Sequence, residues 1–371
     1  MNVGKTPQLS PGVKQVLHAG TVIVAHPLAL NSRRQLDERR QRALTRYYMD
    51  AGAGGVAVGV HTTQFAIRQA GLFEPVLRLA AETIAEYGAG REPGPGRAFI
   101  KVAGVMGPTE QALAEAELAK RLGYDMVLVS NGGLEGWSEE ALVERTRRIA
   151  EILPVMGFYL QPAVGGRRLS YQFWREVAEI PGLVAIKVAP FNRYQTLEVV
   201  RAVCFSSRRD EIALYTGNDD NFLVDLLTTY RFTVNGQVVE KRFVGGLLGH
   251  WAIWTRQAVK LLEEVKQVWQ QQPEGEVVIP ARLLTLAAQI TDANGAVFDA
   301  AHQFRGCIPG IHEVLRRRGL LEGRWCLDPN EELSEGQAEE IERVCRTYPH
   351  LQDDEFVRAG LDRWLGSGAG R

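Results

Sequence analysis

The sequence predicts a (β/α)8 barrel followed by a C-terminal helical subdomain. Three observations lead to this fold. Eight short apolar runs lie along the chain, and a segment with helical periodicity follows each of them. After the seventh run, a hairpin comes after the helix. The runs are almost continuously apolar, as expected for parallel strands buried on both faces. Eight such strand–helix units close naturally into a barrel, whereas the chain after residue 279 has helical patterns only.

We expect the strands in order at residues 21–30, 55–60, 98–105, 125–130, 154–162, 183–190, 211–217 and 243–249. The helix after the first strand should end at Gly52, a good C-cap, and the helix after the fifth should begin at Ser170, a plausible N-cap. Asn235-Gly236 is a strong signal for a two-residue turn and predicts a hairpin inserted near residues 230–243.

The predicted organisation has three parts. Residues 1–20 form an N-terminal arm, residues 21–278 form the barrel with its inserted hairpin, and residues 279–371 form the helical subdomain. A doubly wound, dinucleotide-binding sheet is the alternative, because Gly52, Gly54 and Ala57 fit G-x-G-x-x-A. That motif should follow a strand, and here it leads into one, so the context argues against the alternative.

Composition excludes several classes of partner. The formal net charge is -1, which gives no attraction to nucleic acid or to an anionic membrane. The N-terminus lacks the apolar stretch of a signal peptide, and no apolar run approaches the ~20 residues that span a bilayer. The four cysteines are scattered without a CxxC pair, so we expect reduced thiols, no metal site and a cytoplasmic location. No organic cofactor is expected either.

The chemistry of a (β/α)8 barrel lies at the carboxyl ends of its strands, and this rule ranks the lysines. Lys187 comes late in LVAIKVAP, whereas Lys101 comes early in AFIKVAGV. A lysine inside a barrel loses hydration, which lowers its pKa and lets the neutral amine attack a carbonyl. Lys187 is therefore the candidate imine-forming nucleophile. A structural ion pair inside the barrel is the alternative for Lys187.

Tyr159 lies at a similar height in the preceding strand. Adjacent strands would bring its hydroxyl within reach of the Lys187 amine, where a phenol could move protons. An ordinary buried tyrosine that hydrogen-bonds the backbone is the alternative.

Polar residues follow three other strands. Thr62 and Thr63 come after the second strand and offer hydroxyls and amides to a carboxylate. His61 stands beside them, and His250 follows the eighth strand; each is a candidate substrate contact or a structural histidine. Asn218 follows the seventh strand, where helix capping is the alternative to a role in binding.

The sequence resembles the dihydrodipicolinate synthase and N-acetylneuraminate lyase superfamily over roughly residues 20–350. The motifs that carry the resemblance are, in order, AHPLAL, GVHTTQF, AGVMGPTEQALAEAELAKRLGYDMVLV, FYLQPAVGGRRLS, GLVAIKVAP, YTGNDD and FVGGLLG. The resemblance implies a barrel enzyme that needs no cofactor, acts on a small 2-oxo acid and assembles as a homo-oligomer, either a dimer or a tetramer.

The resemblance also implies roles for individual residues. Lys187 takes the place of the imine-forming lysine, and Tyr159 that of the proton-relay tyrosine of the Y-x-x-P motif. Thr62 and Thr63 match the paired hydroxyl residues that bind the substrate carboxylate. The family's glycine motif falls at Gly217, and the stretch at Gly249 resembles one whose backbone faces the substrate.

Departures from the family pattern bear on the substrate. Gln64 and Phe65 replace the usual Gly-Glu, and Val164 stands where dihydrodipicolinate synthases carry an arginine for a second carboxylate, which argues against lysine biosynthesis. Residues 130–133 (SNGG) replace a tyrosine-rich stretch, so a second relay tyrosine is not evident. Pro162-Ala163 with Gly166 is closer to the lyase branch.

Three functions follow as hypotheses. The leading one is a class I aldolase, lyase or synthase that binds pyruvate or a related 2-oxo acid through Lys187. The second is a dehydratase of a 2-keto-3-deoxy sugar acid with the same imine chemistry. The third is a non-catalytic 2-oxo acid binding protein on the same barrel.

Overall fold

Eight parallel strands form a closed barrel in the computed structural model, which describes residues 6–89, 98–270 and 277–366. Their order around the barrel is β1-β10-β7-β6-β5-β4-β3-β2. The predicted (β/α)8 fold is confirmed. The barrel strands are β1 (Val22–Ala25), β2 (Gly55–Val58), β3 (Ile100–Val105), β4 (Met126–Val129), β5 (Val155–Leu160), β6 (Leu183–Ala189), β7 (Ala213–Thr216) and β10 (Phe243–Leu248).

Each barrel strand lies inside its predicted apolar run, and nearly all strand residues are buried. The runs are longer than the strands because apolar residues continue into the loops. After β1, for example, the amide of His26 still donates to the Ala57 carbonyl, but Pro27 has no N–H to continue the ladder.

Helix α1 (Pro11–Ala19) precedes β1, and further helices follow the barrel strands in the predicted alternation. They are α2 (Glu38–Ala51), α3 (Phe73–Ala89), α4 (Thr109–Arg121), α5 (Glu139–Ala150), α6 (Tyr171–Ala178), α7 (Arg193–Cys204), α8 (Phe222–Leu226) and α9 (Thr255–Gln270). Gly52 ends α2 in the left-handed conformation, at φ 94°. The Ser170 hydroxyl accepts from the Phe173 amide at 3.1 Å and caps α6. Both predicted caps are confirmed.

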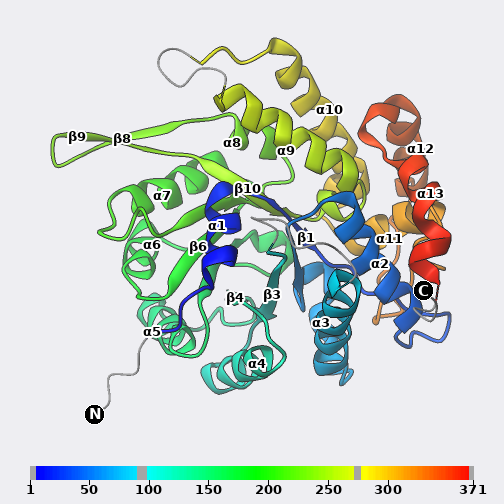
Figure 1. Ribbon diagram of the computed structural model, residues 1–371, viewed down its shortest axis with the longest axis horizontal. Helices are drawn as coiled ribbons and strands as arrows, with labels where there is room; N and C mark the ends of the chain where they lie inside the picture. The colour runs from blue at the N-terminus through cyan, green and yellow to red at the C-terminus, as the bar shows by residue number, and fades with distance from the viewer. Residues whose placement is uncertain (1–5, 90–97, 271–276, 367–371) are drawn as a thin grey trace. The chain divides into compact units, whose positions relative to one another are not determined.

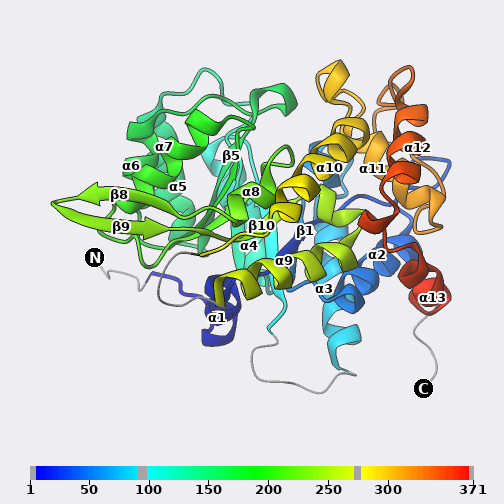
Figure 2. The ribbon, with the colours of Figure 1, turned by 90° about the horizontal axis from the view of Figure 1, so that it is seen from above.

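The inserted hairpin is a two-stranded antiparallel ribbon of β8 (Tyr230–Val234) and β9 (Gln237–Lys241). Asn235 (φ 50°) and Gly236 (φ 81°) form its turn. Both have positive φ, as the predicted two-residue turn requires. The ribbon runs beside α7 and projects beyond it in both views (Figure 1 and Figure 2).

Contact clustering divides the chain into two compact units. The first contains Met1–Thr21 and Ile100–Leu247, and the second contains Val22–Phe99 and Leu248–Arg371. The predicted boundaries at residues 20 and 278 divide the chain into consecutive segments. Each compact unit instead combines two segments that are separate in the sequence, so the domain assignment stays a prediction.

The second unit holds the C-terminal helices α10 (Ala281–Val297), α11 (Cys307–Arg317), α12 (Gln337–Thr347) and α13 (Asp354–Leu365). Within this unit α10 packs against α11 and α12, and α13 packs along α2 (Figure 1). A buried bond between the Tyr47 hydroxyl and Asp353 (2.8 Å) joins α2 to the turn before α13. None of the described helices is long and apolar enough to cross a membrane.

Candidate active site

Lys187 is the fifth residue of β6, in the carboxyl half of the strand, and its side chain is buried with 8% exposure. Its Nζ lies 4.5 Å from the centroid of the Phe158 ring in β5. Burial lowers the pKa of Lys187 to about 8, and the nearby Asp219 carboxylate opposes that shift. At a pKa of 8, about one amine in ten is neutral at pH 7, against about one in 2,500 for an ordinary lysine. This amine is therefore equipped to attack a carbonyl.

The strand register decides which side chains face Lys187. Phe158 is the direct partner of Lys187, and Tyr159 is the partner of Val188. Partner side chains in neighbouring strands share one face of a sheet, and successive residues alternate between faces. Phe158 thus shares the face of Lys187, and Tyr159 points to the opposite face.

The surroundings of Tyr159 agree with this placement. Its ring packs on Trp174 of α6, with centroids 5.4 Å apart. Its hydroxyl donates to the Leu169 carbonyl (3.3 Å) and accepts from the Leu169 amide (3.2 Å). A Cβ added to Gly157, two residues earlier on the same face, would also meet Trp174, at 3.4 Å. The expectation that Tyr159 lies beside the Lys187 amine is therefore wrong. The alternative of a buried tyrosine bonded to the backbone holds.

Gly217 lies directly against Lys187, as part of the turn after β7. A Cβ added to Gly217 would lie 2.6 Å from Cε of Lys187 and 2.7 Å from Cβ of Ala189. Such distances are shorter than van der Waals contact, so only glycine fits beside the lysine stem. The structure thus brings together two of the predicted site residues, Lys187 and Gly217.

Asn218 faces away from solvent into a buried polar network centred on Asp225 of α8. Its side-chain amide donates to Asp225 (2.9 Å) and to the Thr196 hydroxyl (3.3 Å), and its oxygen accepts from the Phe191 amide (3.1 Å). The Asp225 carboxylate also accepts from Arg193, Thr216 and Tyr230. Asn218 is therefore a loop-fixing residue, and it does not cap α8, which begins after Asn221.

Thr62, Thr63 and His61 belong to the second unit, where they form the 3-10 turn η1 (His61–Thr63) after β2. Thr63 Oγ1 donates to the His26 carbonyl (2.7 Å) and accepts from the Gly59 amide (3.0 Å). Thr62 Oγ1 donates to the same carbonyl at a longer 3.3 Å. The Thr63 hydroxyl therefore stabilises the turn through these hydrogen bonds. Carboxylate binding by this turn stays a prediction.

Gly249 and His250 also belong to the second unit, at the end of β10 and the start of the 3-10 turn η4 (His250–Ala252). His250 is buried, and its Nδ1 lies 2.6 Å from the Asn294 side-chain oxygen of α10. Burial lowers the pKa of His250 to about 4, so the ring is neutral at pH 7. A Cβ on Gly249 would meet the Phe298 ring at 3.3 Å. Both residues are packed against the C-terminal helices of their own unit.

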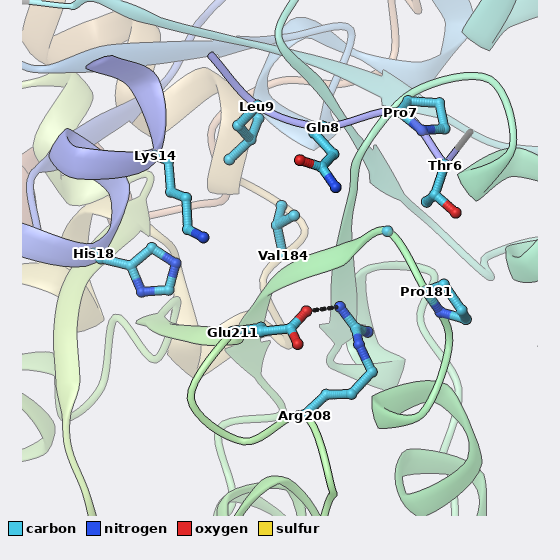
Figure 3. A pocket seen from close by; sticks show the side chains of 11 residues that line it. Thr6, Pro7, Gln8, Leu9, Lys14, His18, Pro181, Val184, Arg208 and Glu211 are labelled. Atoms are coloured by element: carbon cyan, nitrogen blue, oxygen red, sulfur yellow. Dashed lines mark hydrogen bonds and ion pairs between the residues drawn. The ribbon is translucent and has the colours of Figure 1, made fainter. Parts of the chain in front are cut away.

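A hollow of about 250 Å³ lies in the first unit, at the amino end of β6 (Figure 3). Lys14 and His18 of α1 face it from one side, and an ion pair of Arg208 and Glu211 borders it from the other. Val184, the second residue of β6, lies between them, three residues before Lys187. The hollow is therefore at the opposite end of the strand from the candidate nucleophile.

No protein-family model matches the chain. The 4-hydroxy-tetrahydrodipicolinate synthase of Desulforudis audaxviator is 28% identical over 210 residues, which is 56% of this chain and 66% of the synthase. The N-acetylneuraminate lyase of Salmonella typhimurium is 27% identical over 209 residues, 56% of this chain and 65% of the lyase. The chain is thus similar in sequence to a dihydrodipicolinate-type synthase and to an N-acetylneuraminate lyase.

Solved structures share the fold of this chain. Dihydrodipicolinate synthase from Oceanobacillus iheyensis superposes with a TM-score of 0.69 at 17% identity, over 91% of this chain and 99% of that one. YagE from E. coli K12, solved in complex with pyruvate, has a TM-score of 0.69 at 17% identity and covers 89% of this chain and 98% of its own. The curated relatives, in contrast, are matched over less than two thirds of their length.

Sequence reasoning missed Phe158, the register partner of Lys187, and two carboxylates on the loop and helix after β7, Asp219 and Asp225. No signal in the sequence separates Phe158 from Tyr159, because the strand register decides which of two successive residues faces Lys187. Asp219 stood in the sequence only as one of three polar residues after β7, and nothing there singled it out. Asp225 lies on an apolar helix, where a buried carboxylate is rare and so signals a partner.

Proposed function

We propose that this protein is a class I lyase or aldolase that binds a 2-oxo acid as an imine on Lys187. The observation that carries the proposal is a buried amine with a pKa of about 8 in the carboxyl half of β6. Barrel enzymes place their chemistry at this end of the strands. The sequence similarity to a named synthase and a named lyase supports the same conclusion.

The proposed reaction begins with the neutral Lys187 amine. Its lone pair forms a C–N bond to the 2-oxo carbon, and the carbonyl π electrons move to oxygen. That oxygen takes one proton from the attacking nitrogen and one from solvent and leaves as water, and a protonated imine remains. The imine draws electrons from the adjacent carbon, so a bond at that carbon can break or form.

Reductive trapping tests this proposal. We expect borohydride with pyruvate to reduce the imine and add the mass of one reduced pyruvate to the Lys187 peptide. Lys187→Ala should give no adduct. Lys101→Ala is the matched control, because Lys101 is also a barrel-strand lysine but lies at the second residue of β3, near Asp125. Wild-type protein that gives no adduct with any 2-oxo acid would contradict the proposal.

The substrate class is proposed from chemistry and from relatives. YagE and the synthase from Acinetobacter baumannii were each solved with pyruvate, so we propose pyruvate or a longer 2-oxo acid here. Product analysis on a panel of 2-oxo acids and 2-keto-3-deoxy sugar acids separates carbon–carbon cleavage from dehydration. We also propose a homo-oligomer, as the family resemblance implies, which light scattering tests.

A non-catalytic 2-oxo acid binding protein is the second candidate. Phe158 favours it, because an aromatic ring without a hydroxyl is the register partner of Lys187. Such a protein would form the imine and go no further. Exchange of the C3 protons of pyruvate with D2O separates the two candidates, because exchange requires the enamine that follows the imine.

A further inference from the structure

The amino-terminal helix α1 carries two basic side chains on one face. Lys14 and His18 are four residues apart, a spacing that makes side chains neighbours on a helix. The helix is fixed to the barrel, because the Tyr215 hydroxyl of β7 donates to the Leu17 carbonyl at 2.8 Å. Both basic side chains line the hollow of about 250 Å³ at the amino end of β6 (Figure 3). Helix α1 therefore presents a fixed pair of basic groups to this hollow.

The opposite wall of the hollow is also fixed. The Arg208 guanidinium donates to the main-chain carbonyls of Ile180 and Leu183. It also forms an ion pair with Glu211 at 2.8 Å. Of the described residues that line the hollow, Glu211 alone carries a carboxylate, and Arg208 compensates its charge. This wall therefore adds no net charge to the hollow.

Lys14 and His18 have no comparable partner. Within the described part of the chain, neither side chain forms a hydrogen bond or an ion pair. The pKa of His18 is lowered from its ordinary value, first by burial and then by the positive charges of Lys14 and of Lys241 in β9. The two charges that act on His18 are thus both positive. An anion in the hollow would stabilise Lys14 and protonated His18 together.

The donors around the hollow suit a small oxyanion. Lys14 offers three N–H donors, and the Gln8 side chain, which points into the same space, offers an amide NH2 (Figure 3). The Arg208 fork, which would favour a carboxylate, is already engaged by main-chain carbonyls. The volume of about 250 Å³ is below the ~300–1,000 Å³ of sites for drug-sized ligands. A doubly charged phosphate group fits this size and matches the charges of Lys14 and one protonated His18.

We propose that the hollow binds a phosphate group, held by Lys14, Gln8 and protonated His18. The site lies at the opposite end of β6 from Lys187, so it does not depend on the proposed imine. A bound dianion favours the imidazolium form of His18, and His18 therefore takes up a proton when the anion binds. Because this coupling is reciprocal, the affinity for an anion of fixed charge rises as the pH falls from about 8 to about 6.

Proton NMR of the His18 ring tests the site. Sulfate is the probe, because its two charges stay constant over this pH range, and His18→Gln assigns the signal. We expect sulfate to raise the His18 titration midpoint by about one unit, which corresponds to about tenfold tighter binding to the protonated form. Sodium chloride at the same ionic strength is the control, since screening of the lysine charges also raises the midpoint. An equal rise with both salts would overturn the proposal.

Variants examined by isothermal titration calorimetry separate a site from general surface charge. Lys14→Met should weaken sulfate binding by about tenfold or more, the effect of losing a charged hydrogen bond. Lys120→Met is the matched control, because it removes an exposed lysine of α4 outside the hollow, and it should bind sulfate like the wild type. His18→Gln should bind sulfate with an affinity that no longer rises as the pH falls. Equal affinity of wild type and Lys14→Met would refute the site.

A second pair of probes distinguishes the source of the phosphate group. Inorganic phosphate and glycerol phosphate are titrated in parallel at pH 7 into the wild type and Lys14→Met. Tighter binding of inorganic phosphate supports a site for the free ion, and tighter binding of the ester supports a site for a phosphorylated metabolite. In both cases Lys14→Met should bind about tenfold more weakly. Failure of both probes to bind the wild type would overturn the proposal.

Discussion

Lys187 and Phe158 are register partners in β6 and β5, and the lysine Nζ lies 4.5 Å from the centroid of the phenylalanine ring. The ring face attracts a cation weakly, by about 0.5–2 kcal/mol. It neither accepts nor donates a proton. The other register partner of Lys187 is Tyr215 in β7, and its hydroxyl donates to the Leu17 carbonyl at 2.8 Å.

The pKa of Lys187 can be measured by competitive acetylation with quantification of its peptide by mass spectrometry. We expect a midpoint near pH 8, because burial disfavours the ammonium form. Asp219→Asn should move the midpoint lower, since the Asp219 carboxylate favours the charged form. Asp220→Asn is the control. A midpoint near 10 would show that Lys187 is hydrated and paired like an ordinary lysine.

Lys187→Met should raise the free energy of unfolding at pH 7 by about 1–3 kcal/mol. The folded-state pKa of about 8 is below the unfolded value of about 10.4, so the unfolded state binds more protons between these values. The wild-type protein therefore gains stability as the pH rises through this window. The advantage of the methionine variant should shrink over the same range in urea titrations. A variant less stable than wild type at pH 7 would contradict this expectation.

Tyr159→Phe should affect stability and leave the chemistry intact. The change removes both hydrogen bonds to Leu169 from a buried site, at a cost of about 1–3 kcal/mol. Imine trapping and C3 exchange should stay within about twofold of wild type, because the hydroxyl lies on the face away from Lys187. Urea unfolding measures the first effect. A large loss of exchange in a folded Tyr159→Phe protein would place the hydroxyl inside the site.

Gly217→Ala should impair imine formation. The new methyl group would lie 2.6 Å from Cε of Lys187, so the lysine or the loop must shift. Overpacking of this kind costs about 1–3 kcal/mol, and we expect the rate of trapping to fall at least about tenfold, as misplaced reacting groups lose rate steeply. Gly295→Ala is the control. A Cβ at Gly295 in α10 would meet no atom within 4 Å beyond its own stretch of helix, so stability should rise by up to about 1 kcal/mol. Equal trapping by both variants would contradict the tight fit.

The amino-acid sequence by itself determined the barrel, the order of its strands and the inserted hairpin. These features depend on local signals that repeat along the chain: apolar runs, helical periodicity, and turn residues such as Asn235-Gly236 with its two positive φ angles. It also singled out Lys187, because a lysine late in an apolar strand of this fold has few structural explanations. No long-range contact is needed for any of these inferences.

The tertiary structure alone decided which groups face that lysine. The pairing of β5 with β6 sets Phe158 opposite Lys187 and turns Tyr159 toward Trp174. Because side chains alternate with a period of two, a difference of one residue moves a hydroxyl from one face of the barrel wall to the other. The influence of the Asp219 carboxylate on the pKa of Lys187 likewise depends on the loop after β7, in which Asn218 is bonded to Asp225 of α8. Spacing along the chain carries no information on either point, since both depend on register and packing.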